Sequence, residues 1–256
     1  MSLRVIEPRR LYRQVADQIR ELIASGAYAT GDRLPTEREL SEQLGVSRPT
    51  VREALIALEV EGYVRIRVGS GIYVTRTSGE RPVAIDDRIA EGPFEILRAR
   101  ELVESAVAGE AAALAGEADL ARLDEALARM AAGPHPSATA IALDRAFHVA
   151  VVASLGNAVL ERLVGELFDQ RMTPYFARLS HYFETDESWR LAHAEHMLVR
   201  DAIAAGDRAG ATAAMRSHLQ ASQSRFQTSF GEADPKGRAS GTETEQQKKR
   251  QREDRT

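Results

Sequence analysis

Two helix-start signals stand only eleven residues apart in the stretch LPTERELSEQLGVSRPTVREAL, residues 34–55. The first is a capping box, in which Thr36 and Glu39 satisfy each other's unpaired backbone amides. Gly45 tolerates the left-handed backbone that ends a helix. Ser47 is a favoured residue at the start of the next helix. Two short helices joined by so tight a turn predict a helix-turn-helix.

The hydrophobic period changes after this motif. In YVRIRVGSGIYVT, residues 63–75, apolar residues alternate with arginines up to a glycine-rich turn, and the chain then returns. This pattern predicts a β-hairpin. With an amphipathic helix predicted before the motif, residues 1–75 are expected to form a winged helix-turn-helix domain.

The start of the second helix carries the chemistry of this domain. A helix that enters the major groove presents the side chains of its first turns to base edges, here Arg48, Thr50 and Arg52. Arginine grips guanine through two hydrogen bonds, and a hydroxyl such as that of Ser47 can hold phosphate. The alternative is a solvated arginine face on a structural helix. Capping, turn, arginines and wing together favour DNA binding.

The formal net charge of the chain, -4, does not exclude DNA binding. A small basic surface can lie on an acidic protein. Cysteine is absent from the sequence, which excludes disulfides and thiolate metal sites. No apolar run approaches transmembrane length, and the start lacks the apolar core of a signal peptide. We therefore expect a soluble, cytoplasmic protein that does not interact with a membrane.

The remaining sequence predicts a second domain that is all-α. Residues 76–92 are polar with little periodicity and are expected to be a linker. Residues 93–230 are helical in pattern, with breaks that divide them into about six helices. Residues 231–256 contain almost no apolar side chains and are expected to be disordered. The predicted fold class is mainly α.

One carboxylate and three imidazoles of the second domain are candidates for a metal site. Asp144 and His148 are four residues apart, so they lie on one face of a helix. His196 and His218 belong to two later helices. Together these groups could bind zinc, nickel or manganese and leave coordination positions open. Spacing alone also allows each histidine to be a packed or surface residue.

The first domain resembles the DNA-binding domain of the GntR family of bacterial transcriptional regulators. The matching motifs are GDRLPTEREL, GVSRPTVREAL and the glycines of the wing, and the resemblance covers residues 12–74. The family commonly binds palindromic operators in double-stranded DNA as homodimers. The resemblance implies that DNA is contacted by Arg38, Arg48, Thr50 and Arg52, and approached by Gly69 at the tip of the wing.

The second domain is similar to the FCD effector domain of the FadR-like branch of this family. The matching segments are LDRAFHVAVVASLGNAVLERLV, the segment that begins at His196, and AMRSHL. In that domain the matching aspartate and three histidines bind a divalent metal in the effector cavity, and all four are present here. His193 shares roughly the helix face of His196 and is the alternative ligand.

Arg100 matches the family arginine that faces the cavity and pairs with an effector carboxylate. Guanidinium suits this role because it binds a carboxylate through two parallel hydrogen bonds. The alternative is a surface arginine paired with Glu101 or Glu104. GPFEILRARELVES, FDQRMTPYFARLSHYF and DESWRLAHAEH look like the hexuronate-utilisation repressors, which implies a hexuronate or a related sugar acid as effector.

Three functions are compatible with these features. The leading interpretation is a metabolite-responsive regulator, most simply a repressor, whose helical domain dimerises and binds a small acid. A second is a metalloenzyme fused to a DNA-binding module, in which Glu195 acts as a base, although no HExxH motif is present. In the third, the metal itself is the signal.

Overall fold

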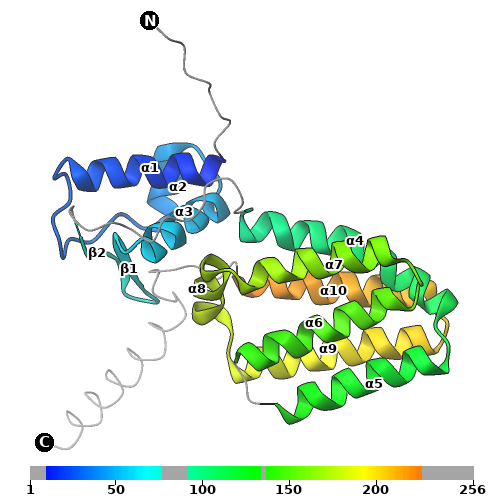
Figure 1. The fold of residues 1–256 in the computed structure, drawn as a ribbon. Helices are drawn as coiled ribbons and strands as arrows, with labels where there is room; N and C mark the ends of the chain where they lie inside the picture. The colour runs from blue at the N-terminus through cyan, green and yellow to red at the C-terminus, as the bar shows by residue number, and fades with distance from the viewer. Residues whose placement is uncertain (1–9, 77–90, 134–136, 227–256) are drawn as a thin grey trace, which may run out of the picture. The chain divides into compact units, whose positions relative to one another are not determined.

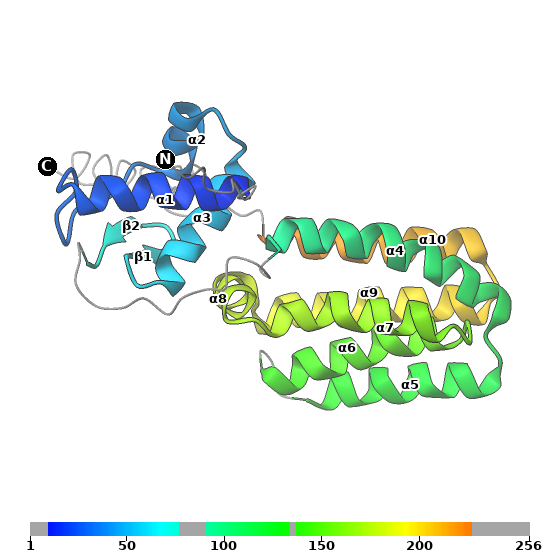
Figure 2. The ribbon, with the colours of Figure 1, turned by 45° about the horizontal axis from the view of Figure 1, so that its top comes forward.

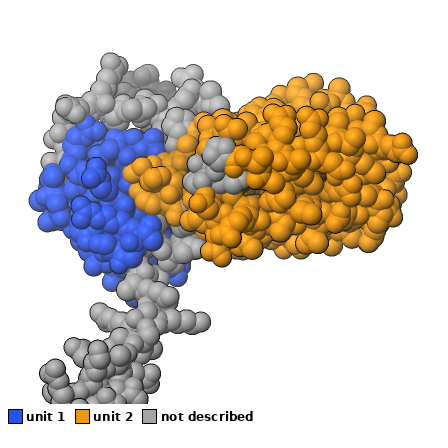
Figure 3. Space-filling view, turned by 90° about the horizontal axis from the view of Figure 1, so that it is seen from below, with its two compact units in different colours: residues 1–84, 229–256 blue, residues 85–228 orange. Residues whose placement is uncertain are grey.

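The computed structural model describes residues 10–76, 91–133 and 137–226. The described residues form two compact units, one within residues 1–84 and the other within residues 85–228, shown in two colours in Figure 3. The predicted tail lies outside the described residues, and so do positions 77–90 of the predicted linker.

The first unit contains three helices and a two-stranded antiparallel sheet (Figure 1). The elements are α1 (Leu11–Ala24), α2 (Glu37–Leu44), α3 (Arg48–Val60), β1 (Val64–Arg67) and β2 (Gly71–Val74). In the sheet, Val64 lies opposite Val74 and Ile66 lies opposite Ile72. These side chains are buried, whereas the arginines of β1 alternate with them and are exposed. This is the winged helix-turn-helix that the sequence predicts.

Both helix starts of the motif have the predicted geometry. The backbone amide of Glu39 donates to Thr36 Oγ1 at 3.3 Å, and Thr36 donates its own amide to Glu39 Oε2 at 2.8 Å. Gly45 ends α2 with a φ of 65°, in the left-handed region. Ser47 Oγ then accepts a hydrogen bond from the backbone amide of Thr50 at 3.3 Å. The local sequence therefore determines where α2 ends and α3 begins.

The second unit is all-α, which confirms the predicted fold class. Its α-helices are α4 (Pro93–Leu114), α5 (Glu117–Ala132), α6 (Ala138–Ala153), α7 (Ala158–Asp169), α8 (Pro174–Phe183), α9 (Asp186–Ala204) and α10 (Arg208–Phe226). A short 3-10 helix, η1 (Gln170–Met172), precedes α8. The described residues thus hold one α-helix more than the six expected. The extra helix is α8, which Thr173 caps at its start, while Thr185 caps the start of α9.

The long helices of the second unit pack closely around one apolar core. Helices α4 and α10 lie side by side along most of their length (Figure 2). Gly109 of α4 permits this approach, because a Cβ there would overlap the Thr212 side chain of α10. Phe147, Val164 and Val199 are fully buried in the core. Within the described ranges, no helix is long and apolar enough to cross a membrane.

Candidate DNA-binding surface and metal centre

The predicted DNA contacts on α3 differ in their exposure. The side chain of Arg48 is 38% exposed, and Thr50 is half-buried beside it. The hydroxyl groups of Ser47 and Thr50 lie 2.8 Å apart at the start of the helix. Arg52, in contrast, is only 2% exposed. The side chain of Arg48 and the two hydroxyls are therefore accessible at the start of α3, whereas the side chain of Arg52 is buried.

Glu37 of α2 holds Arg52 in this buried position. Arg52 Nε donates to Glu37 Oε2 at 3.0 Å, and Arg52 Nη2 donates to Glu37 Oε1 at 2.7 Å. Arg48 Nε reaches the same carboxylate at 3.3 Å. Because Glu37 is fully buried, this ion pair joins α2 to α3. A contact between Arg52 and a base would require this ion pair to open, and the role of Arg52 in DNA binding stays a prediction.

Glu37 was not predicted as a functional residue. Acidic side chains are common in the first turn of a helix, where they stabilise the helix dipole. From the sequence, Glu37 would be assigned only this role. Sequence spacing does not predict the distance between two residues on separate helices. The packing of α2 on α3 alone brings Glu37 to Arg52.

The remaining predicted contacts lie on exposed parts of the first unit. Arg38 is 57% exposed and donates to Glu42 Oε1, one turn further along α2, at 2.9 Å. Gly69 lies in the turn between β1 and β2 with a φ of 73°, a conformation that favours glycine. Arg65 and Arg67 of β1 face solvent. This arrangement gives the wing a basic surface with a small tip.

In the second unit, the four predicted metal ligands come together. They are Asp144 and His148 on α6, His196 on α9 and His218 on α10. Each residue is buried and offers one ligand atom, and the four atoms lie within 4.8 Å of one another. His196 Nε2 lies 3.3 Å from His148 Nε2 and 3.0 Å from His218 Nε2. Asp144 Oδ1 is 3.3 Å from His196 Nε2.

Two carboxylates outside the cluster lie beside the Nδ1 atoms of two of its histidines. Glu104 Oε2 lies 2.5 Å from His148 Nδ1, and Glu195 Oε2 lies 2.8 Å from His218 Nδ1. These carboxylates favour a proton on Nδ1 of His148 and of His218, and the Nε2 atom of each neutral ring then directs its lone pair toward the centre of the cluster. Among the described residues, Asp144 Oδ1 is buried and accepts no hydrogen bond. Lone pairs that face one another around an unsatisfied carboxylate oxygen fit a bound cation.

The pKa values in the cluster suit metal binding at most of its positions. Burial lowers the pKa of His196 and of His218 well below the usual value, and the neighbouring histidines lower it further. Burial would raise the pKa of Asp144, but His148 and Arg171 outweigh it and hold the pKa well below its usual range. Neutral imidazoles and an ionised carboxylate are the forms that bind a metal.

His148 behaves differently because Glu104 lies beside it. Burial lowers the pKa of His148, but the Glu104 carboxylate outweighs this effect and raises it. The pKa of Glu104 is itself lowered to about 2, since Arg100 and His148 overcome the effect of burial. A proton and a metal ion therefore compete for His148.

The other histidines do not join the cluster. His193 Nε2 lies 3.1 Å from the carbonyl oxygen of Leu127 on α5, so this side chain points away from the ligand atoms. His181 is exposed on α8. His135 lies outside the described residues. The structure thus groups His196, and not His193, with Asp144.

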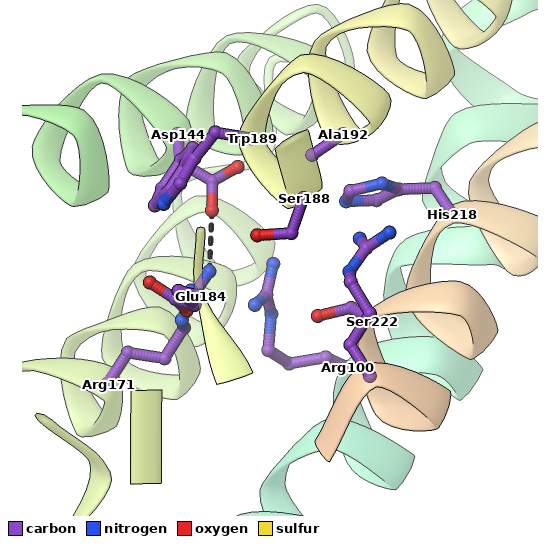
Figure 4. Close-up of a pocket in the computed structure, with 10 residues that line it drawn as sticks. Arg100, Asp144, Arg171, Glu184, Ser188, Trp189, Ala192, His218 and Ser222 are labelled. Carbon is purple, nitrogen blue, oxygen red and sulfur yellow. Dashed lines mark hydrogen bonds and ion pairs between the residues drawn. The ribbon is translucent and has the colours of Figure 1, made fainter. Parts of the chain in front are cut away.

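A pocket adjoins the cluster (Figure 4). Its wall includes Arg100, Arg171, Glu184, Ser188, Trp189, Ser222, Arg225 and two cluster residues, Asp144 and His218. The Arg100 side chain extends into the middle of the pocket (Figure 4). Arg100 Nε also donates to Glu104 Oε1 at 2.6 Å, so the arginine both faces the cavity and pairs with Glu104. Glu101 pairs instead with Arg98.

Three charged residues near the cluster were missed or misjudged. Arg171 Nη1 donates to Asp144 Oδ2 at 2.5 Å, and its Nη2 donates to Glu184 Oε1 at 2.6 Å. Arg171 lies just before α8 and Glu184 directly follows it, so neither residue belongs to a sequence pattern that predicts a site. Glu195, considered above as a base, accepts from Arg225 at 3.1 Å and binds His218. Its position is that of an outer carboxylate that orients a ligand.

Comparison with known proteins agrees with both halves of the structure. Residues 11–74 match the bacterial regulatory proteins of the gntR family, and residues 95–221 match the FCD domain. The Exu regulon transcriptional regulator of Escherichia coli (strain K12) is 36% identical over 224 residues, covering 85% of this chain and 85% of the relative. These matches confirm the resemblance seen in the sequence.

Two further relatives have similar names and similar coverage. The Uxu operon regulator of Haemophilus influenzae is 35% identical over 212 residues, covering 82% of this chain and 80% of the relative. The Uxu operon transcriptional regulator of Escherichia coli (strain K12) is 35% identical over 218 residues, covering 82% and 84%.

The exposure of the two α3 arginines leads to opposite predictions for their variants. Arg48→Ala should keep the melting temperature and weaken specific DNA binding by about 1–3 kcal/mol, the value of a bidentate base contact. Arg52→Ala should lower the melting temperature, because loss of one partner of a buried ion pair costs about 3–5 kcal/mol. Thermal unfolding and DNA titration of both variants check this. An Arg52→Ala protein that unfolds like the wild type would contradict the structural role.

The geometry of the cluster predicts which residues retain metal. Asp144→Asn keeps the size of the side chain but removes the charge, so we expect metal binding at least roughly tenfold weaker than in the wild type. His193→Gln is the matched control and should retain the wild-type metal content. Elemental analysis of the purified proteins measures both. Equal metal loss in the two variants would mean that the cluster is not the site.

Proposed function

The chain belongs to the GntR family of bacterial regulatory proteins and carries an FCD domain, and from this premise we propose that a sugar acid controls its binding to operator DNA. Like the relatives, the chain is a transcriptional regulator and not an enzyme. The observation that carries the proposal is the pocket that Arg100 shares with the buried Asp144 cluster.

Residues 1–75 are the DNA-binding domain in this proposal. Arg38 and Arg48 lie on exposed helix surfaces, and the wing adds Arg65, Arg67 and Gly69. One winged domain covers one half-site, so a palindromic operator requires two copies. Residues 93–230 are the effector-binding domain and also form the homodimer. Double-stranded operator DNA and a second copy of the chain are therefore the macromolecular partners.

The cluster would hold a divalent metal ion. Three imidazole nitrogens and one carboxylate oxygen suit zinc, nickel or manganese, and the ligand set alone does not select among them. A cation held by four protein ligands with positions left open attracts an anionic oxygen ligand. The outer carboxylates of Glu104 and Glu195 support this role, because they orient two of the imidazoles.

Arg100 would bind the carboxylate of the effector on the pocket side of the cluster. Its guanidinium packs over the ring of Phe168, with Cζ 4.4 Å from the ring centre, which fixes its plane. Three relatives are named as regulators of the Exu regulon or of the Uxu operon. These names support the hexuronate class that the sequence resemblance implies.

The size of the pocket links binding to a change in structure. Its cavity volume is about 30 Å³, room for about one or two water molecules. A six-carbon acid enters only if the wall moves, so the acid-bound and acid-free conformations differ. A ligand that prefers one of them changes the affinity of the protein for DNA. We propose that the acid weakens operator binding, as in a repressor.

The proposal predicts an acid-specific release of DNA. The probe is a duplex enriched by the wild-type chain from a random library. D-glucuronate or D-galacturonate should weaken binding of the metal-loaded protein to this duplex, and D-glucose should not. Removal of metal with a chelator should abolish the response to acid. If the chelator alone releases DNA and no acid has an effect, the metal is the signal and the sugar-acid proposal fails.

Arg100→Lys tests the contact to the carboxylate. Lysine keeps the charge but loses the two-pronged geometry, so the acid concentration for half-release should rise by at least about tenfold. Arg98→Lys is the matched control, because Arg98 lies on the same helix, pairs with Glu101 and is 57% exposed. DNA binding without acid should be unchanged in both variants, and the acid response is compared at equal metal content. An unchanged acid response in Arg100→Lys would exclude Arg100 from the site.

A further inference from the structure

Every arginine that lines the pocket is already paired with a carboxylate. Arg100 pairs with Glu104, and Arg225 pairs with Glu195. Arg171 lies between two carboxylates, those of Asp144 and Glu184, at 2.5 and 2.6 Å. The cationic wall of the pocket therefore offers less positive charge than three arginines would suggest.

Each pair also leads to the metal cluster. Glu104 bridges Arg100 to His148, and Glu195 bridges Arg225 to His218. Arg171 contacts the cluster directly through Asp144. Since these contacts hold the arginines in place, the charges around the pocket form one connected set. Glu184 differs from the other three carboxylates, because it neither belongs to the cluster nor contacts one of its histidines in the described structure.

The net charge of these paired arginines and carboxylates determines which ligand charge the pocket can accommodate. Three guanidinium groups, those of Arg100, Arg171 and Arg225, are ion-paired with four carboxylates, those of Glu104, Asp144, Glu184 and Glu195. The set therefore has an excess of one negative charge while the histidines are neutral. A divalent cation in the cluster converts this excess into one positive charge. One carboxylate of a ligand then brings the whole set to neutrality.

We propose that this charge balance restricts the effector to acids with a single negative charge, and that Glu184 is the residue that excludes a second one. The inference rests on the proposed function and narrows its ligand class. A second carboxylate would have to lie in a largely buried pocket whose arginines are already neutralised. An uncompensated charge in such a place is costly.

The wall away from the cluster suits hydroxyl groups. Glu184 accepts hydrogen bonds, and the Ser222 hydroxyl can both donate and accept them. The Ser188 hydroxyl already donates to the Thr185 carbonyl oxygen and accepts from the Thr185 amide, each at 2.8 Å. Figure 4 shows the Ser188 hydroxyl above the end of the Arg100 side chain, inside the pocket. A polyhydroxy chain that ends in an aldehyde or alcohol can hydrogen-bond to Glu184 and Ser222 without adding charge. A dicarboxylic sugar acid of the same length adds the charge that the pocket does not balance.

Three six-carbon acids test the proposal with the metal-loaded, full-length protein. D-glucuronate and D-gluconate carry one carboxylate, and D-glucarate carries two on the same carbon skeleton. Binding is measured by calorimetry, and the shift in melting temperature is measured in parallel. The wild type should bind at least one monoacid about tenfold or more tightly than D-glucarate. D-gluconate controls for the open-chain form.

Glu184→Gln then tests the residue. Glutamine keeps the shape and removes one negative charge, so the preference for the monoacid over D-glucarate should fall by about tenfold or reverse. Glu187→Gln is the matched control, since Glu187 is an exposed residue of α9 outside the pocket and should keep the wild-type preference.

Each other outcome overturns a defined part of the account. Equal binding of D-glucarate and the monoacids by the wild type would overturn the charge restriction and leave the proposed function intact. A Glu184→Gln protein that loses affinity for all three acids alike would exclude Glu184 as the source of specificity. A metal-loaded wild type that binds none of the acids would overturn the proposed sugar-acid effector itself, together with this inference.

Discussion

Three imidazole nitrogens and one carboxylate oxygen converge inside the helical unit, and the surrounding structure depends on keeping them there. Their lone pairs face one another within a few ångströms, an arrangement that is unfavourable in an apolar core unless a cation occupies the centre. The ligands come from three helices, α6, α9 and α10. The cluster therefore forms only when these three helices pack in one arrangement, and a bound cation would stabilise that arrangement.

The same constraint extends outward through charged pairs. Glu104 and Glu195 hold the imidazoles and also neutralise Arg100 and Arg225. Arg171 ties Asp144 to the chain segment after α8. A ligand that competes for one of these arginines therefore disturbs contacts of the metal ligands as well. In the proposed function, this coupling is the route by which an acid in the pocket would change the conformation of the helical unit.

Local signals predicted much of this molecule, whereas contacts between distant segments were not predictable. Caps at Thr36 and Ser47 placed α2 and α3 correctly, because a cap involves residues within one turn. The cluster was expected from a family resemblance, since spacing could not separate His193 from His196. Only the packing of α9 against α5 directs His193 to Leu127. The roles of Glu37 and Arg171 were not predicted because their partners lie on other elements. The burial of Arg52 was not predicted for the same reason, since Glu37 holds it in place.

An anomalous diffraction experiment tests the central claim most directly. Crystals of the full chain grown with Zn²⁺ and D-glucuronate are measured at the zinc absorption edge. The account predicts one strong peak inside the bundle, about 2.0–2.2 Å from three histidine Nε2 atoms and one Asp144 oxygen. The acid carboxylate should lie between that peak and Arg100. A bundle without a peak, or a peak bound by His193 or His181 instead, would contradict the account.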